Sequence, residues 1–171
     1  MLKHGYHILG YNDGNHIKEE IHMVGSRVNS SNVNKDFLVN ELGLKQLGNT
    51  TIFRKVNSFV LSPSVQNDAY WFDIRKVNLD KFNRETEKGY LLIRFFNQFL
   101  VISLNDFIDR MIDEDKFANT ANSGVHWKFK VLRTSDGFKV KSMINRKEIA
   151  VIEMDKENVK NLLFENTIVT F

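Results

Sequence analysis

The chain has 171 residues, 42% hydrophobic and 12% aromatic, so it can bury the core of one domain and is not a disordered chain. Its formal net charge of +3 permits nucleic acid as a partner without requiring it. The sequence has no cysteine, which excludes disulfides, a thiol nucleophile and cysteine-ligated metals. Because it has no apolar run of about 18 residues and no signal-peptide pattern, we expect a cytoplasmic protein without a membrane partner.

Residues 1–50 are expected to form an extension that packs on a domain at 51–171. Tyr6–Gly10 has the composition of a short strand, and Asn12-Asp13-Gly14 is a turn signal. His16–Val24 fits a helix or a strand, and Ser26–Asn34 is a polar connector. One helix is predicted from Asn34 to a stop at Gly48-Asn49, on the helical spacing of Phe37, Leu38, Glu41, Leu42 and Lys45.

From Ile52 the chain is predicted to be mainly strand. Ile52–Leu61 is β-rich and precedes the polar loop Ser62–Asp68. Ala69–Val77 alternates like a half-buried strand, with Tyr70, Phe72 and Ile74 on one face and Trp71, Asp73 and Arg75 on the other. Asn78–Lys88 is polar, with one helical turn. A hairpin is then predicted from Tyr90–Phe96 and Phe99–Ser103, around Asn97-Gln98.

The remaining elements complete a mixed α+β, mainly β fold. Ser103 or Asn105 caps a helix whose buried stripe is Phe107, Ile108, Met111 and Ile112. A second polar loop, Asp113–Gly124, leads to a hairpin of Val125–Arg133 and Phe138–Met143 closed by Asp136-Gly137. Glu148–Met154 is a strand, Asp155 caps a helix through Phe164, and Thr167–Phe171 is a last strand. The order predicts an open β-barrel of seven to eight strands with a few short helices.

No catalytic constellation assembles at the usual spacings. His4, His7, His16 and His22 lie in the first 22 residues, but a zinc site needs three or four ligands on a framework, so a polar segment is the simpler reading. A metal-dependent nuclease could use Asp73, but the next strand, Leu91 to Arg94, lacks a carboxylate, and an Asp73–Arg75 surface pair is the simpler reading. No serine lies in a nucleophile elbow, and no glycine loop fits a phosphate. We therefore expect no cofactor, no metal and no enzymatic activity of this chain alone.

The Asp136-Gly137 hairpin gives the most informative pattern. With that two-residue turn, Thr134 would face Lys139 and Leu132 would face Lys141. One face would then carry His126, Lys128, Lys130, Lys139 and Lys141, and the other the apolar residues. Such alternation is ordinary in a half-buried hairpin, yet no acid on these two strands offsets the lysines, and such a surface can neutralise phosphates.

Two polar loops carry side chains that can read base edges. Asn and Gln pair with adenine, Asp accepts from cytosine, and Ser and Thr pair with several bases. A solvated turn is the simpler reading of each loop alone. The candidate DNA contacts in and beside the loops are Ser62, Ser64, Gln66, Asn67, Asp68, Trp71, Arg75, Asn119, Thr120, Asn122 and Ser123.

From about Phe53 to Met143 the order of elements resembles the B3-type DNA-binding pseudobarrel. The resemblance rests on Tyr70-Trp71-Phe72-Asp73-Ile74-Arg75, on Gly89 to Phe95, on Phe99 to Leu104 with the following helix, and on His126-Trp127-Lys128-Phe129. That fold occurs in plant transcription factors and in recognition domains of EcoRII- and BfiI-type restriction endonucleases, and the chain is also similar to the N-terminal domain of LlaJI-like restriction proteins.

The resemblance implies sequence-specific binding of double-stranded DNA, as the recognition module of a bacterial restriction-modification system. Two arms would grip the major groove, here Ser62–Asp68 and Phe117–Trp127. Motor or nuclease subunits or domains of the same system would be further partners. A protein-interaction domain, such as an immunity or accessory protein, is the alternative, and a degenerate or partner-dependent nuclease is the third.

Overall fold

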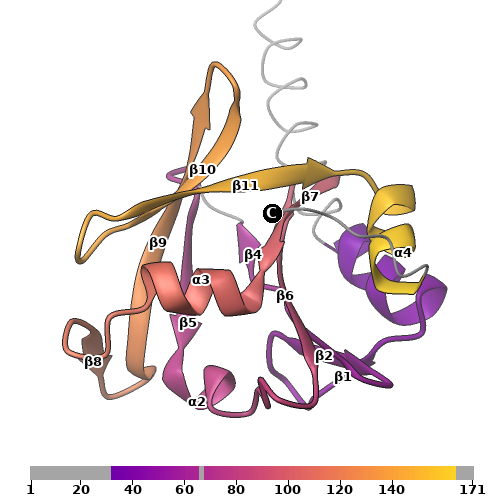
Figure 1. Cartoon of the computed structure of the whole chain (residues 1–171), viewed down its shortest axis with the longest axis horizontal. Helices are drawn as coiled ribbons and strands as arrows, with labels where there is room; N and C mark the ends of the chain where they lie inside the picture. Colours follow the sequence, from indigo (N-terminus) through magenta and orange to yellow (C-terminus); the bar gives the residue numbers. More distant parts are fainter. Residues whose placement is uncertain (1–31, 66–67, 165–171) are drawn as a thin grey trace, which may run out of the picture.

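The computed structural model describes residues 32–65 and 68–164, which form a mainly β fold with four helices (Figure 1). Eleven strands join one open, unclosed sheet. Their bounds are β1 Lys45–Gln46, β2 Ile52–Lys55, β3 Ser58–Leu61, β4 Ser64–Val65, β5 Trp71–Arg75, β6 Lys88–Phe95, β7 Gln98–Ser103, β8 Ala118–Thr120, β9 Gly124–Thr134, β10 Gly137–Ser142 and β11 Glu148–Met154. The helices are η1 Phe37–Glu41, α2 Lys76–Leu79, α3 Leu104–Met111 and α4 Lys156–Phe164.

The strand order is β1-β2-β3-β6-β7-β11-β10-β9-β5, with β4 paired to β6 and β8 paired to β9. The mainly β prediction is confirmed, but eleven strands replace the expected seven to eight. The additional strands β1, β4 and β8 have only two or three residues each, too few for an alternating pattern to be visible in the sequence.

The two halves of the sheet are covered differently. In β6 and β7 the runs Leu91–Ile93 and Phe99–Ile102 are buried on both faces, the pattern of strands covered on two sides. One face packs in a core with α3, through Phe107 and Met111. The other packs in a second core with η1 and α4, through Leu38 and Leu162.

In the other half, β5, β9 and β10 bury mainly one face, and on the opposite face His126 is the one buried residue among the described positions of these strands. The predicted alternation of β5 is confirmed, since Phe72 and Ile74 are buried while Trp71, Asp73 and Arg75 are exposed. Within the described part of the chain, the other side chains on the face opposite the core are half-buried or exposed, and it is the face on which the basic residues were expected.

The first described helix is shorter than predicted. Residues 32–36 are α-helical and continue into the π-helical turn η1, which ends at Glu41 instead of near Gly48. Gly43 has a φ of +64°, which suits glycine just after a helix end. Lys55 Nζ donates to Leu42 O at 2.8 Å, so a cation from β2 stabilises this helix terminus. The predicted stop at Gly48-Asn49 is wrong, because Gly43 already ends the helix and the residues after it join the sheet as β1.

The register of the β9–β10 hairpin also corrects the prediction. Thr134 pairs with Gly137 and Leu132 with Lys139, so Ser135 and Asp136 form the turn and the expected Thr134–Lys139 pairing is wrong. Gly137 is the first residue of β10, with a φ of +133° that glycine tolerates. The shift is two residues, and side chains alternate with a period of two, so the inner and outer faces remain as predicted.

Both predicted helix caps are present. Ser103 Oγ accepts from the backbone N–H of Asp106 at 3.4 Å at the start of α3, and Asp155 Oδ1 accepts from that of Asn158 at 2.8 Å before α4. Within the described residues, no helix combines the length and apolar character needed to span a membrane. The predictions for residues 1–31 (the four N-terminal histidines included), for Gln66 and Asn67 and for Thr167–Phe171 lie outside the described residues. The division at residue 50 stays a prediction.

Candidate nucleic-acid interface

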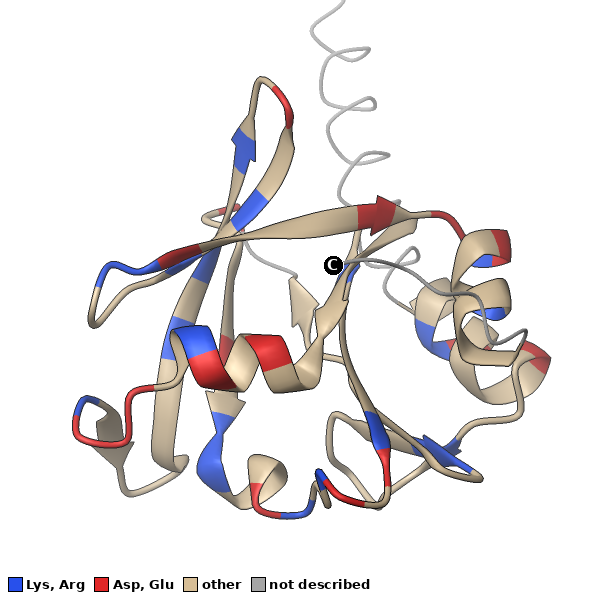
Figure 2. Ribbon diagram, viewed as in Figure 1, with Lys and Arg blue, Asp and Glu red and all other residues tan. Residues whose placement is uncertain are grey.

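The outer face of β5, β9 and β10 carries five cations. The even-numbered residues of β9 and the odd-numbered residues of β10 share this face, because Lys130 pairs with Lys141 and Leu132 with Lys139. The register of β5 adds to it, since Arg75 pairs with His126 and Trp71 with Lys130. We call this surface the basic face; its cations are Arg75, Lys128, Lys130, Lys139 and Lys141. Figure 2 shows basic positions in blue along β9 and β10.

Two carboxylates from the flanking strands reduce the charge of the basic face. Asp73 on β5 pairs in register with Lys128. Glu148 on β11 lies opposite Lys141, with its carboxylate 3.4 Å from Lys141 Nζ and 4.0 Å from Lys139 Nζ. These two carboxylates therefore offset part of the positive charge of the lysines. The sequence of the two hairpin strands alone could not reveal this, because the carboxylates belong to β5 and β11. Five cations against two acids leave an excess of three positive charges.

The two polar loops flank this face at opposite ends of the β5–β9 ladder. Asp68 comes before Trp71, which pairs with Lys130, whereas the β8–β9 turn comes just before Gly124. Lys130, at the level of the first loop, and Gly124, beside the β8–β9 turn, are six residues apart on β9, which corresponds to about 20 Å along the strand. Asn122 is exposed at the tip of the β8–β9 turn, and Asn119 and Thr120 are exposed on β8.

Two candidate contact residues are buried. Ser62 is 0% exposed, and its Oγ donates to Leu92 O at 2.7 Å, so it fastens the first loop to β6. His126 is 2% exposed, and its Nδ1 lies 2.8 Å from Gly124 O, the hydrogen-bonding partner that fixes the ring. Both side chains support the loops from within, because a buried and internally bonded group cannot reach a base edge.

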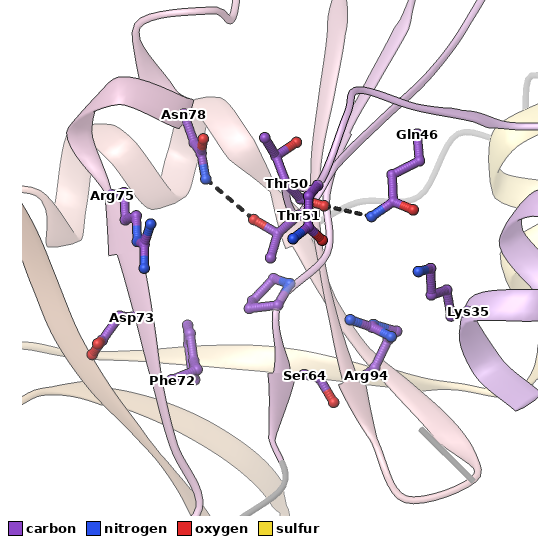
Figure 3. Close-up of a pocket in the computed structure, with 12 residues that line it drawn as sticks. Lys35, Gln46, Thr50, Thr51, Ser64, Phe72, Asp73, Arg75, Asn78 and Arg94 are labelled. Carbon is purple, nitrogen blue, oxygen red and sulfur yellow. Dashed lines mark hydrogen bonds between the residues drawn. The ribbon is translucent and has the colours of Figure 1, made fainter. Parts of the chain in front are cut away.

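A polar cavity of about 410 Å³ lies beside β5, the edge strand of the sheet (Figure 3). Phe72, Asp73 and Arg75 on β5 lie on one side of it, and Lys35 and Arg94 lie on the other. We call it the β5 groove; its remaining lining residues are Gln46, Asn49, Thr50, Thr51, Pro63, Ser64 and Asn78. Since Asp73 and Arg75 belong to both, the groove adjoins the basic face.

The β5 groove has three cationic side chains and one carboxylate, which gives an excess of two positive charges. Burial lowers the pKa of Arg94 from its usual value, the direction expected when a cation loses water. An arginine remains charged under physiological conditions despite such a shift. The groove is therefore polar and electropositive, a setting that attracts anions.

The geometry around Asp73 bears on the nuclease alternative. In residues 32–65 and 68–164, no three His, Asp or Glu side chains are grouped closely enough to hold a metal ion. The residue opposite Asp73 on the ladder is Lys128, a cation. The predicted Asp73–Arg75 ion pair is also not formed among these residues, although both side chains extend from the same face of β5.

Sequence reasoning missed most of the groove. Lys35, Gln46, Thr51 and Asn78 come from separate segments, and only the folded sheet brings them together. Arg94 did carry a signal, because it is the one charged residue in the apolar run 91–95 of a strand that is covered on both faces. A lone cation in such a strand indicates a polar site.

Comparison with known proteins gave no further assignment: no protein-family model, curated protein or solved structure matches this chain.

Proposed function

We propose that this chain binds double-stranded DNA sequence-specifically, as the recognition module of a bacterial restriction-modification system. The observation that carries the proposal is the basic face, where five cations stand against two carboxylates on one face of the sheet. The sequence resemblance of residues from about Phe53 to Met143 to the B3-type pseudobarrel is the ground for the restriction-system role. Phosphate contacts from lysine and arginine supply affinity and orientation, whereas base contacts supply specificity.

The strands hold the phosphate contacts at regular spacing. Lys128 and Lys130 lie two residues apart on β9, hence about 6.6 Å apart on one face, so each can meet a different phosphate. Trp71, 43% exposed on β5, lies opposite Lys130 and adds an apolar surface for a sugar or a base. The ladder pairing of β5, β9 and β10 sets the spacing of these groups along the duplex.

The flanking loops read the bases in this proposal. Their separation of about 20 Å exceeds the major-groove width of about 12 Å, so they enter the groove at two points along its length. At about 3.4 Å per base pair, this distance corresponds to a site of about six base pairs. Asp68 in the first loop and Asn122 in the second are exposed and able to reach base edges.

The protein-interaction alternative would need a contiguous exposed apolar patch. The exposed large apolar side chains of the described residues belong to separate segments, among them Val56 in the β2–β3 turn, Val77 on α2 and Phe164 on α4. Phe117, which is also exposed, lines a pocket together with Ile108, Ile112 and Val125, and this apolar hollow is the surface that the alternative would use.

The test is fluorescence anisotropy with duplex oligonucleotides over a salt series. If three to five phosphates are neutralised, log affinity should fall against log salt with a slope of about −2.7 to −4.5. Lys128→Ala and Lys130→Ala should weaken binding to all sequences about equally. Lys160→Ala, an exposed lysine on α4, is the matched control and should have little effect. A slope near zero, or equal losses in all three variants, would contradict the proposal.

A further inference from the structure

We propose that the β5 groove binds a small phosphate monoester of about nucleoside-monophosphate size. This inference does not depend on the DNA-binding proposal, because it concerns a cavity too small for a duplex. Its volume of about 410 Å³ falls within the range of about 300–1,000 Å³ that is usual for small-ligand sites.

The charge of the groove selects among anions. Lys35, Arg75 and Arg94 against Asp73 leave two positive charges. A phosphate monoester carries about 1.5 to 2 negative charges at pH 7, whereas a carboxylate or a phosphodiester carries about one. Guanidinium groups also present paired donors that match two phosphate oxygens. A monoester therefore fits the groove better than a singly charged anion.

Several groups in the groove have no competing partner. In the described part of the chain, the side chains of Lys35, Arg75 and Asp73 form no hydrogen bond or ion pair. A ligand can therefore engage them without breaking an internal bond.

The neutral side chains of the groove are held in place by internal bonds. Gln46 Nε2 donates to Thr50 O at 2.7 Å, and Asn78 Nδ2 lies 3.4 Å from Thr51 Oγ1. Asn78 is 8% exposed, so its position is fixed by packing as well. Their remaining oxygen and N–H groups can meet the hydroxyl and amide groups of a sugar or base.

The arrangement gives the ligand two ends. Lys35 and Arg94 lie on one side of the β4 segment, whereas Asp73 and Arg75 lie on the other (Figure 3). The phosphate would meet Lys35 and Arg94. The polar part of the ester group would reach Asn78 and Asp73, a carboxylate that accepts from a hydroxyl or amino group. A phosphate alone would fill only one end.

Isothermal titration of the full chain with adenosine 5′-monophosphate tests the inference. We expect binding that is at least about 10-fold tighter than that of adenosine or 3′,5′-cyclic adenosine monophosphate, because these lack the monoester dianion. Affinity should also fall below about pH 6, where the monoester takes up a proton. No binding at millimolar concentration, or equal binding of adenosine, would overturn the inference.

Variants locate the site. Lys35→Gln should weaken binding by about 10-fold or more, since it removes a charge-assisted contact with the phosphate. Arg75→Gln should weaken binding less, since it lowers the positive charge of the groove without removing a phosphate contact. The controls Lys160→Gln and Arg110→Gln alter exposed cations outside the groove and should leave binding unchanged. Circular dichroism melting would verify that each variant folds. Equal losses in variants and controls would overturn the site.

Two sources share this chemistry, a free nucleotide and the 5′-phosphate end of a DNA strand. To separate these two sources, bound adenosine monophosphate is challenged with duplexes that carry or lack 5′-phosphates. If only the phosphorylated duplex displaces the nucleotide, the groove binds the DNA end. Binding of duplex without binding of the monoester overturns this inference alone. Binding of the monoester without binding of duplex supports it and contradicts the DNA-binding proposal.

Discussion

Replacing Glu148 by glutamine should tighten DNA binding. Its carboxylate lies 3.4 Å from Lys141 Nζ and 4.0 Å from Lys139 Nζ, so it holds two lysines of the basic face that would otherwise meet phosphates. Glutamine keeps the size of the side chain and removes the charge. If the basic face binds DNA, Glu148 competes directly with the phosphate backbone.

The expected gain follows from the two ion pairs. Each exposed pair contributes about 0.2–1 kcal/mol, so DNA that displaces both loses about 0.4–2 kcal/mol. A change of about 1.4 kcal/mol corresponds to a tenfold change in affinity, and salt at about 0.1 M weakens the two ion pairs by screening. The affinity of Glu148→Gln for DNA should therefore rise about two- to tenfold. If one further phosphate is neutralised, the slope of log affinity against log salt should steepen by about 0.9.

Glu153→Gln provides the matched control. Glu153 lies on the same strand, β11, and its replacement changes the net charge equally. It lies five residues beyond Glu148, so its side chain has the opposite alternation, and it pairs with Leu100 of β7. Anisotropy titrations should give a clear gain for Glu148→Gln and little change for Glu153→Gln. Equal effects would mean that only net charge matters, and an unchanged affinity in both would refute the role of the basic face.

Three further predictions concern stability and base reading. Gly89→Ala should lower the free energy of unfolding by about 1–3 kcal/mol in urea titrations, because a Cβ there would lie 2.3 Å from Phe82 Cζ; unchanged stability would mean that the ring moves away freely. Burial raises the pKa of Tyr90 above 10.0, so the folded state holds the phenol proton more tightly; this contribution is full below pH 10 and is lost as pH rises above it. Between pH 9 and pH 11, the free energy of unfolding of Tyr90→Phe should therefore fall less than that of the parent protein. Identical pH profiles of the two proteins would argue against a raised pKa of Tyr90. Asn122→Ala should cost about 1–3 kcal/mol of specific binding and relax one base position in selection from a random pool, while non-specific binding survives; an unchanged motif would exclude this loop from base reading.

Local patterns predicted the strands near the basic face well. The alternation of Trp71 to Arg75 and the apolar stripe of β9 depend only on neighbouring residues, so the sequence contains them directly. The hairpin register was wrong by two residues, because a turn signal at Gly137 does not tell whether the glycine is within the turn or follows it. An even shift leaves the faces unchanged, which is why the lysines still share one surface.

Features that depend on distant segments could not be predicted. The partial neutralisation of Lys141 comes from Glu148, whose strand pairing is a property of the sheet order and not of the hairpin. The β5 groove likewise needs the helix residue Lys35 and the strand residue Arg94 to meet beside β5. Single-sequence patterns indicate hairpin neighbours but not which distant strands pair. The burial of Ser62 and His126 was equally hidden, since Ser62 begins the predicted polar loop and His126 lies on the predicted basic face.

The unequal covering of the sheet has a consequence for motion. Amides of β6 and β7 are enclosed by two cores and should exchange with deuterium only through global unfolding. The distal β9–β10 hairpin has one core beneath it and solvent above, so it can open locally at lower free energy. The protein thus joins a slowly exchanging half to a more adaptable half. A partner that meets the adaptable half can reshape it without unfolding the rest of the molecule.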